Sequence, residues 1–293
     1  MVEDILFRIE YQNIGLLLDE RKNKMTSEQL ANRIKLKVWN MAYKAKASHM
    51  GGNFSVADAI AVLYHDIAKV DPQNPKDENR DRIILSKGHC CAIIYAVLAE
   101  YGFINEKDLD TFGENGSIFS CHISCKVPGV EFSSGSLGHG AAVAAGIALN
   151  GKIKNKDYKV FAIVGDGECN EGSIWEMIMF AGHNKLSNFT VIVDSNKMQA
   201  MGETNDIVNL DPMSEKWRSF GWYAIDVDGH NHNELRNAFN ECTNGKPKVI
   251  ISHTIKGHGI SFMENNLWWH YQIPFGDYYE KAVKELEDEF RRL

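Results

Sequence analysis

The sequence predicts an α/β fold in which a parallel β-sheet carries helices on both faces. Short, uninterrupted apolar runs such as Val160 to Val164 recur along the chain, and they are typical of strands buried on both faces. Between the runs lie longer segments, which are long enough for the crossover helices that parallel strands require. No internal repeat or proline-rich linker divides the sequence, so we expect residues 1–293 to form a single domain.

The individual elements follow from local patterns. Thr26 to Gln29 resembles a capping box before a helical apolar repeat, which predicts a helix over about 27–46. We expect the Gly51-Gly52 pair to interrupt the helical structure and Ser55 to cap a second helix. The predicted strands are Ile83 to Leu85, Val160 to Val164, Thr190 to Val193, Ala224 to Val227 and Val249 to Ser252. The predicted crossover helices are Cys90 to Tyr101, Gly140 to Leu149 and Trp175 to Leu186.

Composition excludes several classes of protein. The 32 Lys+Arg against 39 Asp+Glu give a net charge of −7, which argues against a general nucleic-acid binder. The longest apolar stretches are well below the ~20 residues of a membrane-spanning helix. The acidic N-terminus does not resemble a secretory signal, so we expect a cytoplasmic protein. The six cysteines are too few and too irregular for a disulfide scaffold.

Polar residues follow two consecutive predicted strands. Asp166 lies between two glycines directly after the run Val160 to Val164, and Asn196 follows the next run. Because the carboxyl ends of parallel strands meet at one edge of a sheet, both side chains should reach the same place. A carboxylate, an amide oxygen, a backbone carbonyl and phosphate oxygens together suit Mg²⁺, although a simple Gly-Asp-Gly turn and a helix cap are the alternative. No G-x-G-x-x-G follows any of these strands, which argues against a dinucleotide site.

Two further strand ends carry a lysine beside a histidine. Lys87 and His89 follow the first predicted strand, and Lys256 follows the last. A lysine provides a point charge that suits phosphate. The sequence has 11 histidines, several of them next to glycine, and imidazole moves protons near neutral pH. We expect structural roles for three others, His65, His183 and His232.

The segment Cys121-His122-Ile123-Ser124-Cys125 offers a possible metal site. Structural zinc usually requires four ligands at short paired spacings, which this segment does not supply. We therefore favour the interpretation without a metal there.

Several motifs resemble transketolase, and in particular the first half of a transketolase encoded as two polypeptides. The resemblance covers about residues 30–270, which leaves residues 1–25 as an N-terminal extension and residues 271–293 as a helical tail. Its motifs are SHMGGNFSVAD (48–58), LSKGH (85–89), PGVEFSSGSLGHG (128–140), GDGECNEGSIWE (165–176), VDSNKMQ (193–199), FGW (220–222), VDGH (227–230) and TIKGHGISFME followed by WWH (254–270). Asp166 and Asn196 are separated by 29 residues, of which Gly167 is the first, and this spacing resembles the thiamine-diphosphate motif.

The resemblance implies thiamine diphosphate held through Mg²⁺, with Ca²⁺ or Mn²⁺ as possible substitutes. It implies Asp166, Asn196 and the Met198 carbonyl as metal ligands. It also implies His49, His270 and His122 as histidines that assist proton movement on the substrate. The residues implied around the cofactor are Lys87, His89, Gly135, Ser136, Leu137, Gly167, Asn196, Lys256 and His270.

The implied activity is transfer of a two-carbon ketol unit from a ketose phosphate to an aldose phosphate. A complete transketolase continues with a pyrimidine-binding domain, so the resemblance implies a partner chain, with two copies of each. Glu171 and Glu176 fall at positions associated with subunit contact. The alternatives are a related thiamine-dependent subunit with another carbonyl substrate, and a non-catalytic partner that binds the cofactor.

Some residues depart from the family pattern. The family usually has Gln at the position of His139 and Ser at that of Asn53, and often Ser-Gly-His where this chain has Ala47-Ser48-His49. We expect these differences to bear on the choice of sugar. The segment around His122 also lacks the usual glycine and proline.

Overall fold

A computed structural model describes residues 25–293 of the chain. Its centre is a five-stranded sheet with strand order β1-β2-β3-β5-β4, and every neighbouring pair is parallel. The strands are β1 (Arg82–Leu85), β2 (Val160–Gly165), β3 (Phe189–Ser195), β4 (Tyr223–Asp228) and β5 (Lys248–His253). The predicted α/β fold with a parallel sheet is therefore confirmed, and each predicted strand is present.

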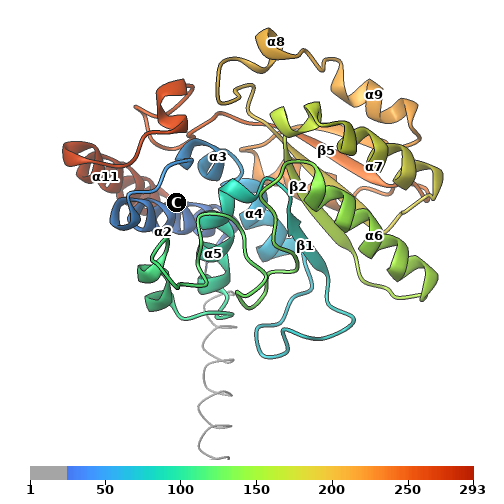
Figure 1. The fold of residues 1–293 in the computed structure, drawn as a ribbon, viewed down its shortest axis with the longest axis horizontal. Helices are drawn as coiled ribbons and strands as arrows, with labels where there is room; N and C mark the ends of the chain where they lie inside the picture. Colours follow the sequence, from blue (N-terminus) through green and yellow to red (C-terminus); the bar gives the residue numbers. More distant parts are fainter. Residues whose placement is uncertain (1–24) are drawn as a thin grey trace, which may run out of the picture.

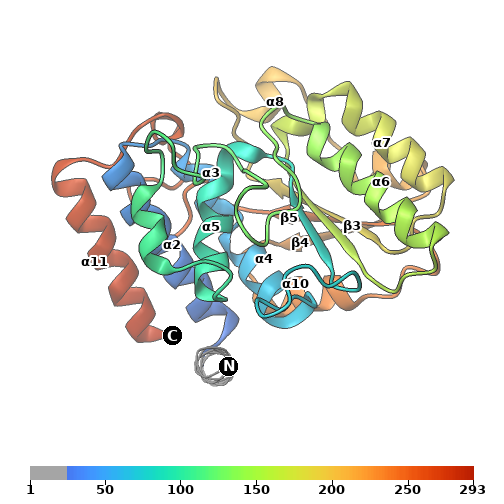
Figure 2. The ribbon, with the colours of Figure 1, turned by 60° about the horizontal axis from the view of Figure 1, so that its bottom comes forward.

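Helices cover both faces of the sheet (Figures 1 and 2). The α-helices are α2 (Ser27–Ala45), α3 (Met50–Ser55), α4 (Ala57–Val62), α5 (Cys91–Glu100), α6 (His139–Ile153), α7 (Gly172–His183), α8 (Thr204–Ile207), α9 (Met213–Ser219), α10 (His232–Asn240) and α11 (Gly276–Arg292). Shorter turns are the π-helix Leu63–Ile67 and the 3₁₀ helices Gly88–Cys90, Glu106–Thr111, Gly167–Asn170 and Leu267–His270. None of the helices in residues 25–293 combines the length and apolar character that a membrane crossing requires.

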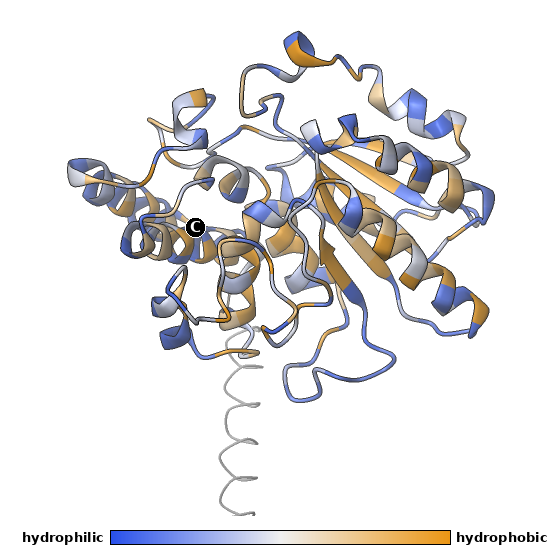
Figure 3. Cartoon of the chain, viewed as in Figure 1, coloured by the Kyte–Doolittle hydropathy of each residue, from blue (hydrophilic) through white to orange (hydrophobic). Residues whose placement is uncertain are grey.

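The two faces of the sheet belong to two separate apolar cores. Along β2, Phe161 and Ile163 pack with residues of α2, α4, α5 and α10. Val160, Ala162 and Val164 point the other way and pack with α6, α7 and α9. This alternation is the period of two that a strand imposes on its side chains. Figure 3 shows that the strands are hydrophobic along most of their length, as burial on both faces requires.

The outer strand β4 departs from the prediction. It was expected to be buried on both faces, but Asp226 is exposed and Ile225 is only partly buried. The reason is topological, since β4 lies at the edge of the sheet and pairs only with β5 among the described strands.

The N-terminal helices confirm one prediction and correct another. α2 begins with the expected capping box, in which Thr26 and Gln29 bond each other's backbone amides. Gly51 and Gly52, however, lie inside α3 and do not interrupt the helical structure. A Cβ at Gly52 would come 2.8 Å from the Cys90 sulfur, so glycine is needed there for close packing. Ser55 is the last residue of α3 and caps no helix, because its hydroxyl donates to Asp194.

The C-terminal helix α11 lies beside α2 (Figures 1 and 2). Ala282 and Leu286 are buried there, and the Tyr279 ring stacks on Tyr43 with centroids 4.0 Å apart. The helix lies within residues 271–293, where a helical tail is expected. The expected N-terminal extension, residues 1–25, falls outside the described residues except for Met25. The single-domain assignment itself stays a prediction.

Candidate active site

A cavity of about 340 Å³ opens at the carboxyl ends of the strands. Parallel α/β sheets bind ligands at this edge, because the loops that follow the strands converge there. It is lined by His49, Gly52, Lys87, His89, His122, Gly135, Leu137, Gly165, Asp166, Gly167, Glu168, Asn196, Met198, Gln199, Ala200, Lys256, His270 and Tyr271. With one exception, every residue that the sequence analysis singled out for catalysis, cofactor or metal lines this cavity. The exception is Ser136, which is exposed and does not line it.

Asp166 follows β2 and is buried at the base of the cavity. Its Oδ1 accepts from the Gly167 amide at 2.7 Å, and its Oδ2 accepts from the Lys197 amide at 2.7 Å and the Thr204 hydroxyl at 3.1 Å. Burial, with the nearby charge of Asp194, raises the pKa of Asp166 to about 6. The three donors leave at least one lone pair of the carboxylate free. All three are neutral, so none of the described residues bonded to Asp166 balances its negative charge with a positive one.

Asn196 and Met198 lie in the loop after β3. The Asn196 amide Nδ2 donates to Asp194 at 3.0 Å, which orients the amide and leaves its oxygen as an acceptor. That oxygen accepts from the Met198 amide at 3.2 Å. The Met198 carbonyl accepts from the Lys256 ammonium at 2.8 Å.

Asp194 is the centre of a buried hydrogen-bond network that sequence reasoning missed. Its carboxylate accepts from Ser55 at 2.6 Å, Lys87 at 2.6 Å and Thr254 at 2.5 Å, in addition to Asn196. Burial opposes its charge, but the Lys87 ammonium and the hydrogen bonds from Lys87, Ser55 and Thr254 together outweigh burial, so the pKa of Asp194 is lowered. The residue stands in the VDSNKMQ motif, but nothing local in the sequence indicates partners from three other segments.

The Lys87 ammonium is therefore already bound by other residues of the chain. Its ammonium pairs with Asp194 and donates to the Gly52 carbonyl at 2.9 Å. Burial disfavours the ammonium, but Asp194, with contributions from Cys90 and Asp166, more than offsets this, and the pKa of Lys87 is raised. Lys87 thus lines the cavity as a fixed positive charge.

Lys256 approaches the cavity from the loop after β5. Besides the Met198 carbonyl, its ammonium contacts the Gln199 carbonyl at 3.3 Å and donates to His270 Nδ1 at 2.9 Å. Burial lowers the pKa of Lys256 to about 8. It remains predominantly a cation at neutral pH.

Three imidazoles cluster at the cavity. The His49 ring lies 5.3 Å from those of both His89 and His270, measured between centroids. Burial lowers the pKa of His49 and of His89 to about 4 and that of His270 to about 3, with a further contribution from the nearby lysines. His122 also lines the cavity, and burial lowers its pKa. These rings are neutral at pH 7, so each has one acceptor and one donor nitrogen, and in His270 the acceptor Nδ1 is taken by Lys256.

Three cavity residues with polar side chains carried no assignment from sequence: Glu168, Gln199 and Tyr271. Glu168 is buried and accepts from the backbone amides of Gly138 and Gly165, which ties two loops together. Tyr271 is 63% exposed, and its ring meets His270 edge-on. Glu168 lies in the motif GDGECNEGSIWE and Gln199 in VDSNKMQ. Membership of these motifs is the sequence signal that could have placed both residues at the site.

Gln199 lines the cavity and carries a buried amide nitrogen. This nitrogen, Nε2, has no hydrogen-bond partner among the described residues. Its side chain also occupies the space beside Gly167 where a Cβ would otherwise lie, at 3.0 Å. An unpaired buried amide donor, two lysines and an oxygen donor set from Asp166 and Asn196 fit a diphosphate held through a divalent cation.

The other predicted roles can be located as well. His232 is buried and bonds Ser27 and Asp58, and His65 bonds Asp66 and the Met25 carbonyl, as expected for structural histidines. His183 is exposed at the end of α7. Cys121 and Cys125 are exposed and free, and within residues 25–293 they do not belong to a group of potential metal ligands.

Comparison with known proteins identifies the family of the chain. Residues 26–284 match the family described as transketolase, thiamine diphosphate binding domain. An apulose-4-phosphate transketolase subunit from Phocaeicola vulgatus is 40% identical over 270 residues, which are 92% of this chain and 96% of that protein. The 6-deoxy-6-sulfo-D-fructose transketolase subunit SqwG of Clostridium sp. is 39% identical, over 84% of this chain and 90% of that one.

Single-chain transketolases match over less of their own length. The human enzyme is 35% identical over 87% of this chain but only 41% of its own. The crystal structure of the Campylobacter jejuni transketolase superposes with a TM-score of 0.83 at 30% identity, over 89% of this chain and 42% of that one. The match over most of the chain, to both kinds of relative, shows that the protein belongs to the transketolase family and contains its thiamine-diphosphate-binding domain.

Proposed function

We propose that this chain is one subunit of a two-polypeptide transketolase that moves a two-carbon ketol unit from a ketose phosphate to an aldose phosphate. The observation that carries the proposal is the convergence of Asp166, Asn196, Lys256 and the histidines on one cavity. The two relatives described as subunits of transketolases support it, because this chain covers nearly all of their length. A cytoplasmic location stays a prediction from sequence.

We assign the divalent cation to Asp166, Asn196 and the Met198 carbonyl. All three offer hard oxygen atoms, which suit Mg²⁺ and also accept Ca²⁺ or Mn²⁺. A cation there would satisfy the buried Asp166 carboxylate, whose present donors are all neutral.

We assign the diphosphate to the side of the cavity formed by His89, Gly167, Gln199 and Lys256. Lys256 and His89 provide side-chain donors, and the missing Cβ of Gly167 allows the Gln199 side chain to pack closely beside it. Lys87 adds positive charge from its place beside Asp194. Gly135, Ser136 and Leu137 form the segment that we assign to the heterocycle, and Gly135 and Leu137 of this segment line the cavity.

His49, His270 and His122 are the residues that we assign to proton movement. When bound, thiamine diphosphate supplies the electron sink that allows a carbon–carbon bond of the ketose to break. The imidazoles remove a proton from a hydroxyl of the donor sugar as its carbon–carbon bond breaks and give one to the carbonyl oxygen of the acceptor as the new bond forms. No net oxidation occurs, because the two-carbon unit lost by one sugar is gained by the other. The lowered pKa values of His49 and His270 keep both rings neutral at pH 7. Because His270 Nδ1 already accepts from Lys256, its Nε2 carries the proton and acts as the donor towards the substrate.

The remaining part of the enzyme belongs, in this proposal, to a second polypeptide. This chain spans about two fifths of the single-chain transketolases that it matches. We propose an assembly of two copies of each chain, with α7 contributing to contact between copies. Glu171 and Glu176 are exposed on that helix or at its start, beside the exposed side chains of Met179 and Phe180.

Reconstitution tests the proposal. The chain is combined with a candidate second polypeptide, thiamine diphosphate and Mg²⁺, and is supplied with ketose and aldose phosphates. We expect two-carbon transfer, detected as a shortened donor and a lengthened acceptor. A correctly assembled complex that transfers no two-carbon unit from any ketose phosphate would exclude this function.

A related enzyme with another carbonyl substrate is the second candidate. The two subunit relatives carry different substrates in their names, apulose-4-phosphate and 6-deoxy-6-sulfo-D-fructose, so substrates vary among similar chains. Product analysis separates the candidates, because decarboxylation releases carbon dioxide and ketol transfer does not. A cofactor-binding partner without catalytic activity would show binding but neither product.

A further inference from the structure

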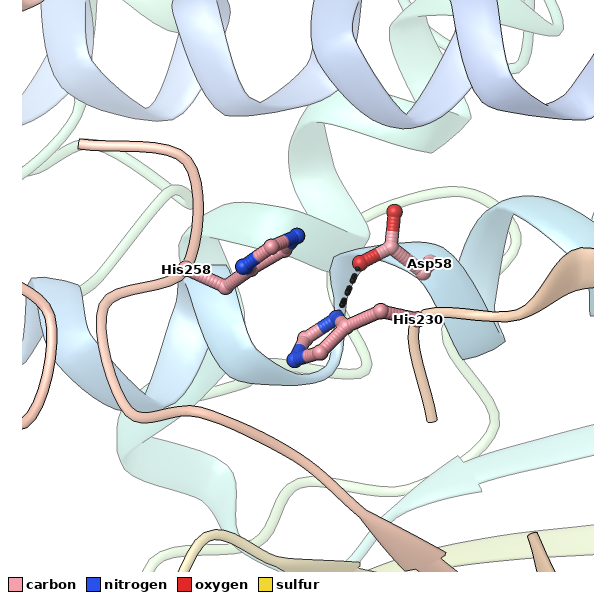
Figure 4. A group of neighbouring side chains, drawn as sticks. All are labelled: Asp58, His230 and His258. Carbon is pink, nitrogen blue, oxygen red and sulfur yellow. Dashed lines mark hydrogen bonds and ion pairs between the residues drawn. The ribbon is translucent and has the colours of Figure 1, made fainter. Parts of the chain in front are cut away.

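A second group of ionisable side chains lies outside the cavity, between α4 and the loops after β4 and β5. Asp58, His230 and His258 have ligand atoms within 4.8 Å of one another, which is close enough for a metal ion. Figure 4 shows the His230 ring beside the Asp58 carboxylate, and the His258 ring stacks on the His230 ring. The hydrogen bonds of His230 decide between a metal site and another role.

Both nitrogens of His230 are already used. Nε2 accepts from the Ile255 backbone amide at 2.8 Å, so in the neutral ring Nδ1 carries the proton and donates to Asp58 at 2.7 Å. The Lys35 ammonium also lies 3.3 Å from Asp58. With no free lone pair on His230 and a cation already beside the carboxylate, the group does not favour a metal ion.

The amide that His230 holds belongs to the residue before Lys256. The neighbouring amides of Thr254 and Gly257 bind backbone carbonyls, those of Ser195 and Gly51, each at 3.1 Å. The Ile255 amide binds a side chain instead, so a single substitution can release it. Releasing Ile255 would loosen the backbone from which the Lys256 side chain reaches the cavity.

We propose that His230 is a positioning residue for Lys256: Asp58 fixes the tautomer of His230, and His230 Nε2 fixes the Ile255 amide. The consequence for cofactor affinity rests on the proposed function, in which Lys256 binds the diphosphate. The effect on the loop does not depend on that assignment.

Two variants separate the two hydrogen bonds of His230. In His230→Asn the amide nitrogen occupies the place of Nδ1 and can still donate to Asp58, but nothing reaches Ile255. In His230→Gln the side-chain oxygen occupies the place of Nε2 and can still accept from Ile255, but the bond to Asp58 is lost. If His230 had only a general packing role, His230→Asn would not be expected to disturb the Ile255 amide more than His230→Gln does.

The first measurement is hydrogen exchange of the Ile255 amide in isoleucine-labelled protein, with its signal identified by loss in Ile255→Val. We expect roughly 5- to 50-fold faster exchange in His230→Asn, as the loss of one buried hydrogen bond allows. His230→Gln should stay near the original protein. Exchange that is unchanged in His230→Asn, or equally fast in both variants, would overturn the proposal.

The second measurement is calorimetric titration of each protein, assembled with the second polypeptide, with thiamine diphosphate and Mg²⁺. His230→Asn should bind roughly 5- to 50-fold more weakly, and His230→Gln should bind nearly as well as the original chain. Equal affinities of both variants would contradict a positioning role. If the complex of the original chain with its second polypeptide binds no cofactor, the proposed function fails, while the exchange measurement still decides the inference about the loop.

Discussion

Two buried aspartates at the cavity have opposite surroundings. Asp194 has its own cation, Lys87, and hydrogen-bond donors from Ser55 and Thr254, and its pKa is lowered. Asp166, whose backbone amide donates to the Asp194 carbonyl, accepts only from neutral donors, and its pKa is raised to about 6. The comparison distinguishes a carboxylate that stabilises the fold from one that is suited to an added cation.

The largest expected effect is on stability, at Asp194. Asp194→Asn should lower the free energy of unfolding by about 3–5 kcal/mol, because it leaves the buried Lys87 ammonium without its counter-ion. Urea unfolding at pH 7 measures the change. The double variant Asp194→Asn/Lys87→Met should recover part of the loss, since it removes the unpaired charge. A single variant as stable as the original protein would show that Asp194 is not a structural centre.

At Asp166 we expect a change in binding instead. Asp166→Ala should weaken Mg²⁺-dependent binding of thiamine diphosphate by more than about 100-fold, because even residues outside the ligand shell contribute about 10–100-fold to metal affinity. Calorimetry measures the affinity, and circular dichroism should show a retained fold. Asp206→Ala, at an exposed position of α8, is the matched control. Unchanged affinity in Asp166→Ala would remove this residue from the cation site.

A smaller effect is expected at His270, on turnover. His270→Ala should lower kcat of the reconstituted enzyme by roughly 10²-fold, the lower end for general acid–base groups, because neighbouring histidines share the work. Loss of cofactor affinity should be less. His183→Ala, at the exposed end of α7, is the control. The reverse pattern, with affinity lost and kcat kept, would reassign His270 to cofactor binding.

The smallest expected effect is a pH dependence from the buried histidines. His89 has a folded pKa of about 4, below the ordinary value of 6.5, so unfolding takes up a proton between these values. Its contribution to stability is therefore present above about pH 6.5 and lost as the pH falls towards 4. In His89→Gln, proton uptake on unfolding near pH 5 should fall by about one. Identical unfolding curves of both proteins across this range would contradict the lowered pKa.

Much of the fold could be predicted because its signals are local. Apolar runs such as Val160 to Val164 mark the strands, and the Thr26 capping box marks the start of α2. The cavity residues could be predicted in part because parallel strands bring their carboxyl ends together, which needs no knowledge of strand order. The motifs that resemble transketolase added roles, which remain proposals.

What sequence missed depends on contacts between distant segments. Ser55 is the type of residue that caps helices, but Asp194, far along the chain, takes its hydroxyl. Gly51 and Gly52 read as a break, but the Lys256 and Cys90 side chains fill the space beside them within α3. The exposure of β4 follows from its place at the sheet edge, which the amino-acid pattern of that strand does not show.

The central claim is that a divalent cation binds between Asp166 and Asn196 and carries the diphosphate of the cofactor. Crystals of the chain grown with thiamine diphosphate and Mn²⁺ test it directly, because anomalous scattering locates the metal. We predict a manganese peak in contact with Asp166, Asn196 and the Met198 carbonyl, with the diphosphate beside Lys256. A peak beside Asp58 and His258, with the cofactor away from the strand ends, would contradict the account.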